Sequence, residues 1–316
     1  MDIRFDGRAV IVTGAGNGLG RAHALELARR GADVVVNDLG GSTSGEGASA
    51  RAADFVVDEI RAGGGNAVAS YASVADDAGC QAIAAAALDA FGRVDAVVHN
   101  AGILRNAPFE SMSDDRVWPV LETHLLGAFF LSRAAYPAMV AQGYGRLVFT
   151  SSGSGAFGRV EGANYAAAKA GVLGLCNALA LEGAPHGILA NALLPVGFTR
   201  LAGAPDAVDD STEAARRREE LASASPRMMP EWVTPMAVYL ASEACTRTQR
   251  FYSAAVGRYA RVFVGAAAGW YADDTGPPSV EDLVAHLDDV ERLDDFDLPS
   301  SVFDELDLIR TRHQSS

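Results

Sequence analysis

The sequence predicts an α/β fold, a doubly wound parallel sheet of seven strands with helices on both faces. Short runs rich in β-branched residues alternate with alanine-rich, helix-forming stretches over most of the 316 residues. Alternation of this kind indicates β–α–β units that build a parallel sheet. A glycine-rich turn also follows the first predicted strand, and open parallel sheets bind their ligands at the carboxyl ends of strands.

Seven segments are predicted as strands: 9–13, 33–37, 67–71, 94–99, 146–150, 188–194 and 261–264. Long helix-forming segments separate the first six of them, for example 20–30, 52–62 and 81–91. A polar stretch follows Pro195, and a further helix is predicted at 212–222.

The last part of the chain, 271–316, is predicted to be an acidic helical extension of a main domain formed by residues 1–270. Gly276-Pro277-Pro278 marks the change, and Ser279 with Asp282 forms a capping box that opens a helix. One face of that helix carries Leu283, Leu287 and Val290, and a second helix begins at Ser301. Apolar stripes of this kind indicate docked helices rather than a disordered tail.

Composition excludes several classes of function. The net charge is −14, and residues 281–308 alone carry −10, so a nucleic-acid partner is not expected. Three cysteines lie far apart, without the spacing of a metal or disulfide framework, which favours a reducing, cytoplasmic location. The longest apolar stretch, 166–181, contains Lys169 and reads as a buried helix, so no membrane span is expected.

Lys169 is the only lysine, against twenty-five arginines, and it follows Tyr165 by four residues. Residues at this spacing share one face of a helix. An ammonium group beside a phenol lowers the pKa of the phenol, which would bring a tyrosine closer to the range of a useful proton acceptor. The alternative is coincidence, but the pair is predicted to be catalytic.

The glycine-rich turn, Thr13 to Gly20, lies between the first strand and the first helix. Glycines at this place let the backbone approach a pyrophosphate, which binds the N–H groups at the amino end of the helix. Asp38 ends the second strand, where a carboxylate accepts hydrogen bonds from ribose hydroxyls and repels a 2′-phosphate; its alternative role is to form the turn before Gly40. No basic residue stands at Asn17 or Leu39, so NAD is the expected cofactor.

Together with His99-Asn100-Ala101-Gly102 and with Ser152, thirteen residues before Tyr165, these motifs resemble the short-chain dehydrogenase/reductase family over residues 5 to about 270. The resemblance implies a Rossmann-like fold and an NAD-binding site. The expected cofactor-binding residues are Gly14, Asn17, Gly18, Leu19, Gly20, Asp38, Leu39, Ser73, Val74, Asn100, Ala101, Gly102, Tyr165, Lys169, Pro195 and Thr199.

Three segments (36–41, 100–105 and 123–125) look like the dehydrogenase regions of peroxisomal D-bifunctional proteins. That branch of the family oxidises (3R)-hydroxyacyl-CoA and some hydroxysteroids, which makes these the expected substrate classes. The chain departs from it after the sheet, where the acidic extension stands in place of hydratase and sterol-carrier domains. Ser73-Val74 also replaces the Asp-Val that many members use to hold the adenine.

The resemblance implies a mechanism. Tyr165 is the expected general acid/base, Lys169 lowers its pKa and holds the nicotinamide ribose, and Ser152 hydrogen-bonds the reacting oxygen. His124 occupies the place where many members carry an asparagine that positions a water. It is either a supporting residue of the proton relay, which could also titrate, or a structural histidine.

Residues 196–232 match the variable lid of the family, where substrate specificity is expected. Within it, Arg216-Arg217-Arg218 could dock CoA phosphates, or could form a solvated helix face paired with neighbouring glutamates. Arg105 is a rival anchor, and Phe157, Val160 and Phe198 either line an apolar substrate pocket or belong to the core.

Two other functional classes stay open. One is an epimerase or dehydratase, against which the Gly14-x3-Gly18-x-Gly20 spacing argues; the other is a non-catalytic NAD-binding scaffold, against which the intact Ser152, Tyr165 and Lys169 argue. Helices around 121–139 and 165–181 lie where the family forms its subunit interface, so a homodimer or homotetramer is expected.

Overall fold

The computed structural model describes residues 2–202, 212–272 and 276–313. The chain divides into two compact units, Met1–Arg261 and Val262–Ser316. The boundary that the sequence suggested near residue 270 therefore falls inside the second unit, and the role of 271–316 as a separate extension stays a prediction.

An eight-stranded sheet organises the first unit, in the order β3-β2-β1-β4-β5-β6-β7-β8. The first seven strands in this order pair in parallel. The predicted seven-stranded parallel sheet is thus confirmed, and an eighth strand extends it at one edge. The strands are β1 (Ala9–Thr13), β2 (Asp33–Asn37), β3 (Asn66–Ser70), β4 (Ala96–His99), β5 (Gly145–Thr150), β6 (Ile188–Val196), β7 (Arg250–Ala255) and β8 (Arg258–Val262).

The seventh predicted strand, 261–264, was wrongly placed. The seventh strand is β7, and residues 261 and 262 belong to β8. Along β7 only Phe251 and Ala254 are buried, so this strand lacks the continuous apolar run that identifies β1, β4 and β5. The two-residue connection Val256-Gly257 has positive φ at both positions, as in a type I′ hairpin, which makes β8 the antiparallel partner of β7.

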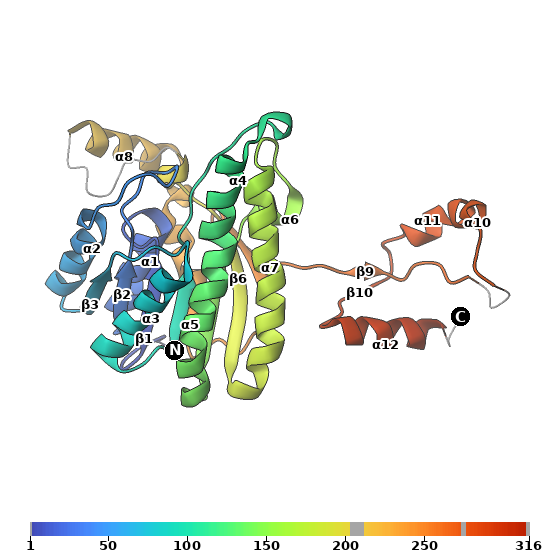
Figure 1. Ribbon diagram of the computed structural model, residues 1–316, viewed down its shortest axis with the longest axis horizontal. Helices are drawn as coiled ribbons and strands as arrows, with labels where there is room; N and C mark the ends of the chain where they lie inside the picture. Colours follow the sequence, from blue (N-terminus) through green and yellow to red (C-terminus); the bar gives the residue numbers. More distant parts are fainter. Residues whose placement is uncertain (1, 203–211, 273–275, 314–316) are drawn as a thin grey trace. The chain divides into compact units, whose positions relative to one another are not determined.

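Helices cover both faces of the sheet (Figure 1). On one face α1 contacts both α2 and α9, and on the other face α3 contacts α5 while α4 and α6 contact α7. The helices of this unit are α1 (Gly18–Arg29), α2 (Arg51–Ala62), α3 (Asp77–Phe91), α4 (Asp114–Leu121), α5 (Gly127–Gln142), α6 (Gly153–Phe157), α7 (Ala163–Gly183), α8 (Thr212–Ala224) and α9 (Thr234–Ala241).

The strand order places a binding crevice at the carboxyl ends of β1 and β4. The chain crosses from β1 to β2 and β3 on one side, and returns to continue with β4 on the other. Loops that follow β1 and β4 therefore diverge, and ligands of doubly wound sheets bind in the crevice between them. The predicted catalytic and cofactor-binding residues come from the segments that follow β1, β2, β3, β4 and β5 and from the end of β6 onward, so they gather at this edge.

The predicted lid begins where β6 ends. A 3₁₀ turn (Arg200–Ala202) and α8 belong to it, and α8 confirms the helix predicted at 212–222. Arg216 and Arg217 both pair with Glu220, as expected of a solvated helix face. Residues 203–211 of the lid lie outside the described part of the chain.

The second unit contains a small antiparallel pair, β9 (Ala266–Ala267) with β10 (Phe296–Asp297), and the helices α10 (Val280–Ala285), α11 (Leu287–Val290) and α12 (Val302–His313). The predicted capping box is present, since the Ser279 Oγ accepts from Asp282 N at 3.1 Å and Asp282 Oδ2 accepts from Ser279 N at 3.0 Å. The single helix expected after it is interrupted at His286, whose ring stacks on Trp270 with centroids 4.2 Å apart.

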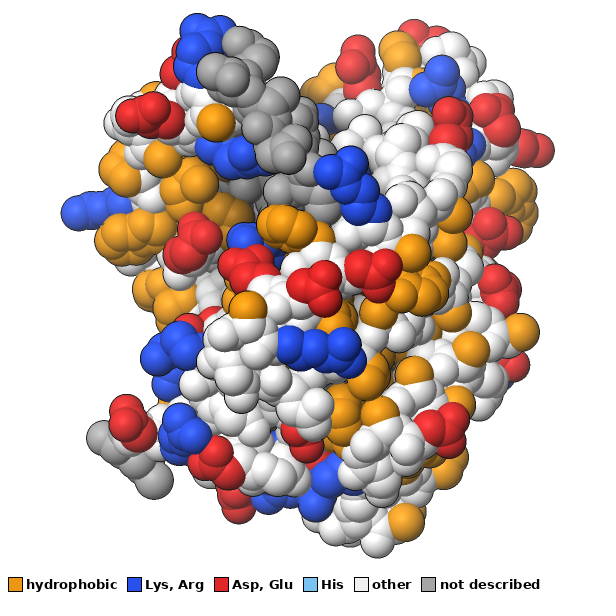
Figure 2. All heavy atoms as spheres, turned by 90° about the vertical axis from the view of Figure 1, so that its left-hand side faces the viewer, with side chains coloured by type: hydrophobic (Ala, Val, Ile, Leu, Met, Phe, Trp, Pro, Cys, Tyr) orange, Lys and Arg blue, Asp and Glu red, His pale blue; other side chains and the backbone are white. Residues whose placement is uncertain are grey.

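Basic and acidic side chains are interspersed on the face shown in Figure 2, rather than gathered into a field of one sign. Among the helices of the described residues, none is long and apolar enough to span a membrane.

Asp95, directly before β4, anchors the amino ends of the strands opposite the crevice. Its carboxylate is 1% exposed and accepts hydrogen bonds from Arg8 Nη1 at 2.8 Å, Arg93 Nε at 2.6 Å and Ala9 N at 2.8 Å. Burial alone would raise the pKa of Asp95, but the hydrogen bonds from Arg93, Arg8 and Ala9 together hold that pKa below its ordinary value. The carboxylate therefore stabilises the fold in its ionised form.

We expect Asp95→Asn to lower the free energy of unfolding at pH 7 by about 3 kcal/mol, because it leaves two guanidinium groups without their buried partner. The folded-state pKa of Asp95 lies below the unfolded value. Its contribution is therefore present above pH ~4 and fades as the pH falls through the lower folded value. Urea unfolding at pH 7 and pH 3 measures both effects.

The matched control is Asp6→Asn, which removes an exposed ion pair with Arg4 and should leave the unfolding midpoint unchanged. Equal effects of the two substitutions would show that Asp95 has no special role.

Candidate active site

The glycine-rich turn joins β1 to α1 and forms one end of a cavity of about 630 Å³. A Cβ on Gly20 would lie 2.2 Å from the carbonyl oxygen of Gly14, so the turn closes on itself only because this position is glycine. Gly14 has φ +61°, and a Cβ there would lie 2.8 Å from the Cα of Ala101. The turn thus leaves the backbone bare beside the amino end of α1, which is the arrangement that suits a diphosphate.

Asp38 lies at the end of β2 and is buried. Its Oδ2 accepts from Gly16 N at 2.8 Å and its Oδ1 from Gly40 N at 2.7 Å. Asp38 therefore forms the turn before Gly40, as its alternative role required, and it also lines the cavity. Each carboxylate oxygen has more than one acceptor position, so both roles are compatible.

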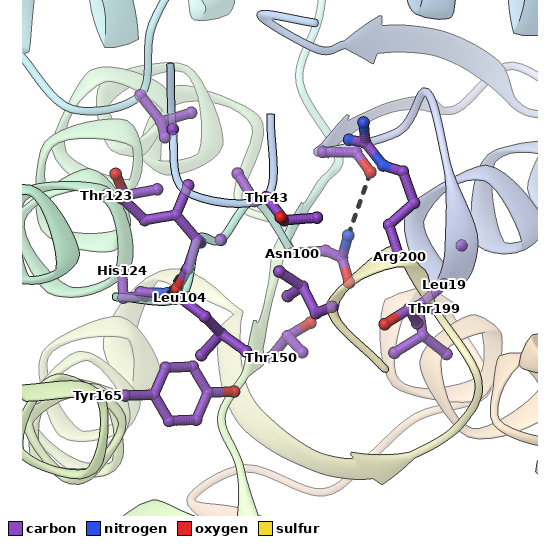
Figure 3. Close-up of a pocket in the computed structure, with 18 of the residues that line it drawn as sticks. Leu19, Thr43, Asn100, Leu104, Thr123, His124, Thr150, Tyr165, Thr199 and Arg200 are labelled. Atoms are coloured by element: carbon purple, nitrogen blue, oxygen red, sulfur yellow. Dashed lines mark hydrogen bonds between the residues drawn. The ribbon is translucent and has the colours of Figure 1, made fainter. Parts of the chain in front are cut away.

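Thr13 joins the ends of β1 and β4. Its Oγ1 accepts from the N–H groups of Asn100 and Ala101, both at 3.0 Å. The Nδ2 of Asn100, labelled in Figure 3, donates in turn to Thr13 O at 3.2 Å and to Gly14 O at 3.3 Å. These bonds hold Asn100-Ala101-Gly102 against the glycine-rich turn.

The other end of the cavity carries Ser152, Tyr165 and Lys169, from the end of β5 and from α7. Ser152 caps α6, its Oγ accepting from Ser154 N at 3.1 Å, and its hydroxyl group lowers the pKa of Tyr165. Figure 3 shows the Tyr165 ring reaching from α7 into the cavity toward Thr150. The structure thus brings together the three residues that the sequence predicted to act as one group.

Lys169 is buried beneath Tyr165. Its Nζ donates to the carbonyl oxygen of Thr150 at 2.5 Å and lies 5.7 Å from the centroid of the Tyr165 ring. The main-chain oxygen of Lys169 accepts from Ser151 Oγ at 2.8 Å. Burial lowers the pKa of Lys169 to about 7, so the amine carries only part of its charge at neutral pH.

The predicted effect of Lys169 on Tyr165 is not present in this geometry. Burial raises the pKa of Tyr165 above its ordinary value, while the hydrogen bond from Ser152 and the charge of Arg159 oppose that rise. The prediction assumed a full ammonium charge at the phenol, whereas the buried Nζ points at a carbonyl and its charge is disfavoured. The opposing cation is Arg159, which the sequence had not singled out.

His124 is buried beside Tyr165, with the two rings edge to face and their centroids 5.1 Å apart. It lies in a π-helical turn, Glu122–Leu126, and its Nε2 is within hydrogen-bond distance of both the N and the O of Ile103. Burial, followed by the charge of Lys169, lowers the pKa of His124 well below its ordinary value, so the ring is neutral. These contacts describe a structural histidine, and a role in the proton relay stays a prediction.

The remaining cofactor residues of the prediction also line the cavity: Asn17, Gly18, Leu19, Leu39, Ser73, Val74, Gly102, Pro195 and Thr199. Figure 3 shows Leu19, Thr199 and Arg200 on the side of the cavity opposite Tyr165. Thr43 and Leu104, which the sequence analysis did not assign to the site, also line the cavity.

The predicted substrate residues need correction. Phe157 is 76% exposed and Val160 is 87% exposed, and neither they nor Phe198 line the cavity. Its apolar lining includes instead Ile103, Leu104, Pro119 of α4 and Leu201.

Arg105 lines the cavity but is already engaged. Its Nε donates to Ser44 O and its Nη1 to Asp115 O, both at 2.7 Å. Together with the bond from Leu104 N to Thr43 O at 2.9 Å, Arg105 fastens the loop after β2 to the loop after β4. We therefore assign Arg105 a positioning role and not the role of a substrate anchor.

Asn164 also escaped the sequence analysis. Its buried Nδ2 donates to Arg105 O at 3.0 Å and Arg116 O at 2.7 Å, and its Oδ1 accepts from Tyr165 N at 2.7 Å. Asn164 thereby fixes the start of α7, and with it the base of Tyr165. In the described residues, no cluster of three or more His, Cys, Asp or Glu side chains has the arrangement of a metal site.

Because burial lowers the pKa of Lys169, the contribution of this residue to the free energy of unfolding depends on pH. Between pH ~7 and its ordinary pKa the unfolded chain binds more protons at this position than the folded chain, so the contribution rises with pH. We expect the stability of the protein, relative to Lys169→Met, to increase between pH 7 and pH 9 in urea unfolding. A difference that stays constant over this range would mean that the buried amine keeps its charge.

Comparison with known proteins agrees with this site. The model of a family described as short chain dehydrogenase matches residues 8–204. A solved short-chain dehydrogenase from Mycobacterium avium superposes with a TM-score of 0.76 at 36% identity, covering 90% of this chain and 95% of that one.

Two curated relatives are similar in sequence. Peroxisomal multifunctional enzyme type 2 of Mus musculus is 46% identical over 81% of this chain, which spans 32% of that enzyme. A hydroxyacyl-CoA dehydrogenase of Mycobacterium tuberculosis is 44% identical over 62% of this chain and 63% of its own length. The similarity to the multifunctional enzyme confirms the resemblance to D-bifunctional proteins.

Proposed function

Because the chain belongs to the short-chain dehydrogenase family, whose members act on CH–OH groups with a nicotinamide nucleotide, we propose that it is an NAD-dependent dehydrogenase of 3-hydroxyacyl-CoA. The observation that carries the proposal is a single cavity, with Ser152, Tyr165 and Lys169 at one end and the glycine-rich turn with Asp38 at the other. A cavity of about 630 Å³ is in the usual range for a ligand site.

The residues of the cavity fit a dinucleotide. Gly14 and Gly18 provide the bare backbone for a diphosphate, Gly20 lets the turn close behind them, and Asp38 offers carboxylate oxygens to a ribose. NAD is favoured over NADP because Asp38 would repel a 2′-phosphate. Arg200 also lines the cavity, and its Nη1 donates to Gly41 O at 3.4 Å.

When bound, NAD supplies the carbon that accepts hydride from the carbinol. Tyr165 takes the proton of the hydroxyl group, and Ser152 donates a hydrogen bond to the reacting oxygen, which is worth about 2.7–4 kcal/mol in comparable sites. Lys169 donates one N–H to Thr150 O, so its remaining N–H groups can donate to the ribose hydroxyls.

The substrate class rests on similarity and on the lining. The multifunctional enzyme and the hydroxyacyl-CoA dehydrogenase suggest an acyl thioester as substrate. The apolar residues Ile103, Leu104, Pro119 and Leu201 accept the hydrocarbon part of such a molecule. The same lining favours a second candidate, a hydroxysteroid or another hydrophobic secondary alcohol.

We further propose a homodimer or homotetramer in the cytoplasm. The exposed Phe129, Val140 and Leu181 on α5 and α7 support the assembly. A reducing compartment is consistent with Cys80, Cys176 and Cys245, which are buried and unpaired.

The function is tested by following NADH formation with (3R)-3-hydroxyacyl-CoA, its (3S) epimer and a 17β-hydroxysteroid. We expect the highest kcat/KM for the (3R) thioester with NAD, a lower value with NADP, and at least a 1,000-fold loss in Tyr165→Phe, because the proton acceptor is removed. Activity on the steroid alone would replace the thioester by the second candidate. No turnover of any of the three would contradict the proposal.

The raised pKa of Tyr165 gives the pH dependence a definite sign. Oxidation requires the phenolate, so its kcat should rise with pH through the alkaline range. Reduction of the ketone requires the phenol, so its kcat should fall over the same range. Stopped-flow rates in both directions from pH 6 to 10 test this; parallel profiles for the two directions would exclude Tyr165 as the group that titrates.

A further inference from the structure

Three arginines line the cavity, and two of them have defined structural partners. Arg105 holds Ser44 and Asp115, and Arg200 donates to Gly41. Arg159 has no ion pair and no hydrogen bond from its side chain within the described residues, and it is exposed. An arginine at the rim of a cavity without a structural partner can bind an anion from solution.

Arg159 lies on the wall of the cavity that carries the reacting groups. The lining residues from this wall are Thr150, Ser151, Ser152, Ser154, Arg159, Tyr165 and Lys169. The wall has no carboxylate, and Lys169 is buried, so Arg159 is its one exposed charge. The lining carboxylates, Asp38 and Glu122, come from the residue that follows β2 and from the π-helical turn.

Arg159 is also close enough to the reacting centre to act on it. Its positive charge lowers the pKa of Tyr165, in opposition to burial. A substrate that places its hydroxyl group between Ser152 and Tyr165 therefore has its neighbouring atoms within the field of this guanidinium.

The loop that carries Arg159 is held in place. Glu161 adopts φ +58°, a left-handed conformation that is uncommon without glycine, and its carbonyl accepts from Ala107 N at 3.1 Å. Asn164 anchors the following residues through Arg105 O and Arg116 O. A fixed loop presents the guanidinium without a large cost in conformational entropy on binding.

We propose that Arg159 binds a negatively charged group of the substrate, on the far side of the reacting carbon from the cofactor. The proposal rests on the proposed function, since it needs a substrate hydroxyl group at Ser152 and Tyr165. A guanidinium matches both carboxylate and phosphate through paired N–H donors.

Two sources can supply the anionic oxygens, the phosphates of a CoA carrier or the carboxylate of a free hydroxy acid. Three substrates with the same reacting carbon separate them: (3R)-3-hydroxybutyryl-CoA, (3R)-3-hydroxybutyrate, and the uncharged N-acetylcysteamine thioester of the same acid. Ratios of kcat/KM between a charged substrate and the uncharged thioester cancel any change that a substitution causes at Tyr165.

In Arg159→Gln we expect this ratio to fall at least tenfold for one of the two charged substrates, mainly through KM. A fall with the CoA ester assigns Arg159 to phosphate, and a fall with the free acid assigns it to carboxylate. Arg159→Lys should restore part of the loss because it keeps the charge. The matched control is Arg258→Gln, an exposed arginine of β8 outside the cavity, which should leave every ratio unchanged.

Equal losses with the uncharged and charged substrates, or unchanged ratios, would overturn the proposal while leaving the dehydrogenase activity of the wild type intact. Wild-type protein that oxidises none of the three contradicts the proposed function instead. In that case calorimetry with 4′-phosphopantetheine and with 3-hydroxybutyrate, in the presence of NADH, still tests Arg159. Binding to the wild type that Arg159→Gln weakens at least tenfold supports the anion site, and equal binding, or none to either protein, refutes it.

Discussion

The buried amine of Lys169 is the interaction on which the arrangement of the active site depends. Its Nζ is bonded to Thr150 O, and its own carbonyl accepts from Ser151, so α7 is tied to the end of β5 at two points. Ser152 follows directly in the chain, and Tyr165 stands one helical turn before Lys169. These two hydrogen bonds between α7 and the end of β5 therefore set the positions of all three reacting residues.

The sequence predicts much of this arrangement because its signals are local. Continuous apolar runs identify the buried strands, and the spacing of Tyr165 and Lys169 follows from helix geometry alone. The sequence does not reveal which partners a side chain finds when loops that are distant in the chain come together. From the sequence, Arg105 was a candidate anchor for the substrate, but in the structure its side chain donates to Ser44 O and Asp115 O. The pKa of Tyr165 was expected to be lowered, but burial, which depends on the whole fold, raises it.

The loop that follows β2, which contains residues 41–44, joins the two halves of the crevice. Its carbonyl groups at Gly41, Thr43 and Ser44 accept hydrogen bonds from Arg200, Leu104 and Arg105, which belong to loops after β6 and β4. These acceptors are backbone carbonyls, so the hydrogen bonds themselves do not depend on the side chains at Gly41, Thr43 and Ser44. The residues that hold it are those of the neighbouring loops.

The eighth strand has a consequence for the solution behaviour of the protein. Within the Met1–Arg261 unit β8 pairs with β7 alone, so one of its sides is an open row of backbone donors and acceptors. Exposed edges of this kind recruit strands from other chains and start aggregation. Arg258 and Arg261 place positive charge along β8, and charged side chains on an edge strand oppose such pairing. The hairpin thus replaces an apolar edge, formed by Phe251 and Ala254, with one that resists self-association through its backbone.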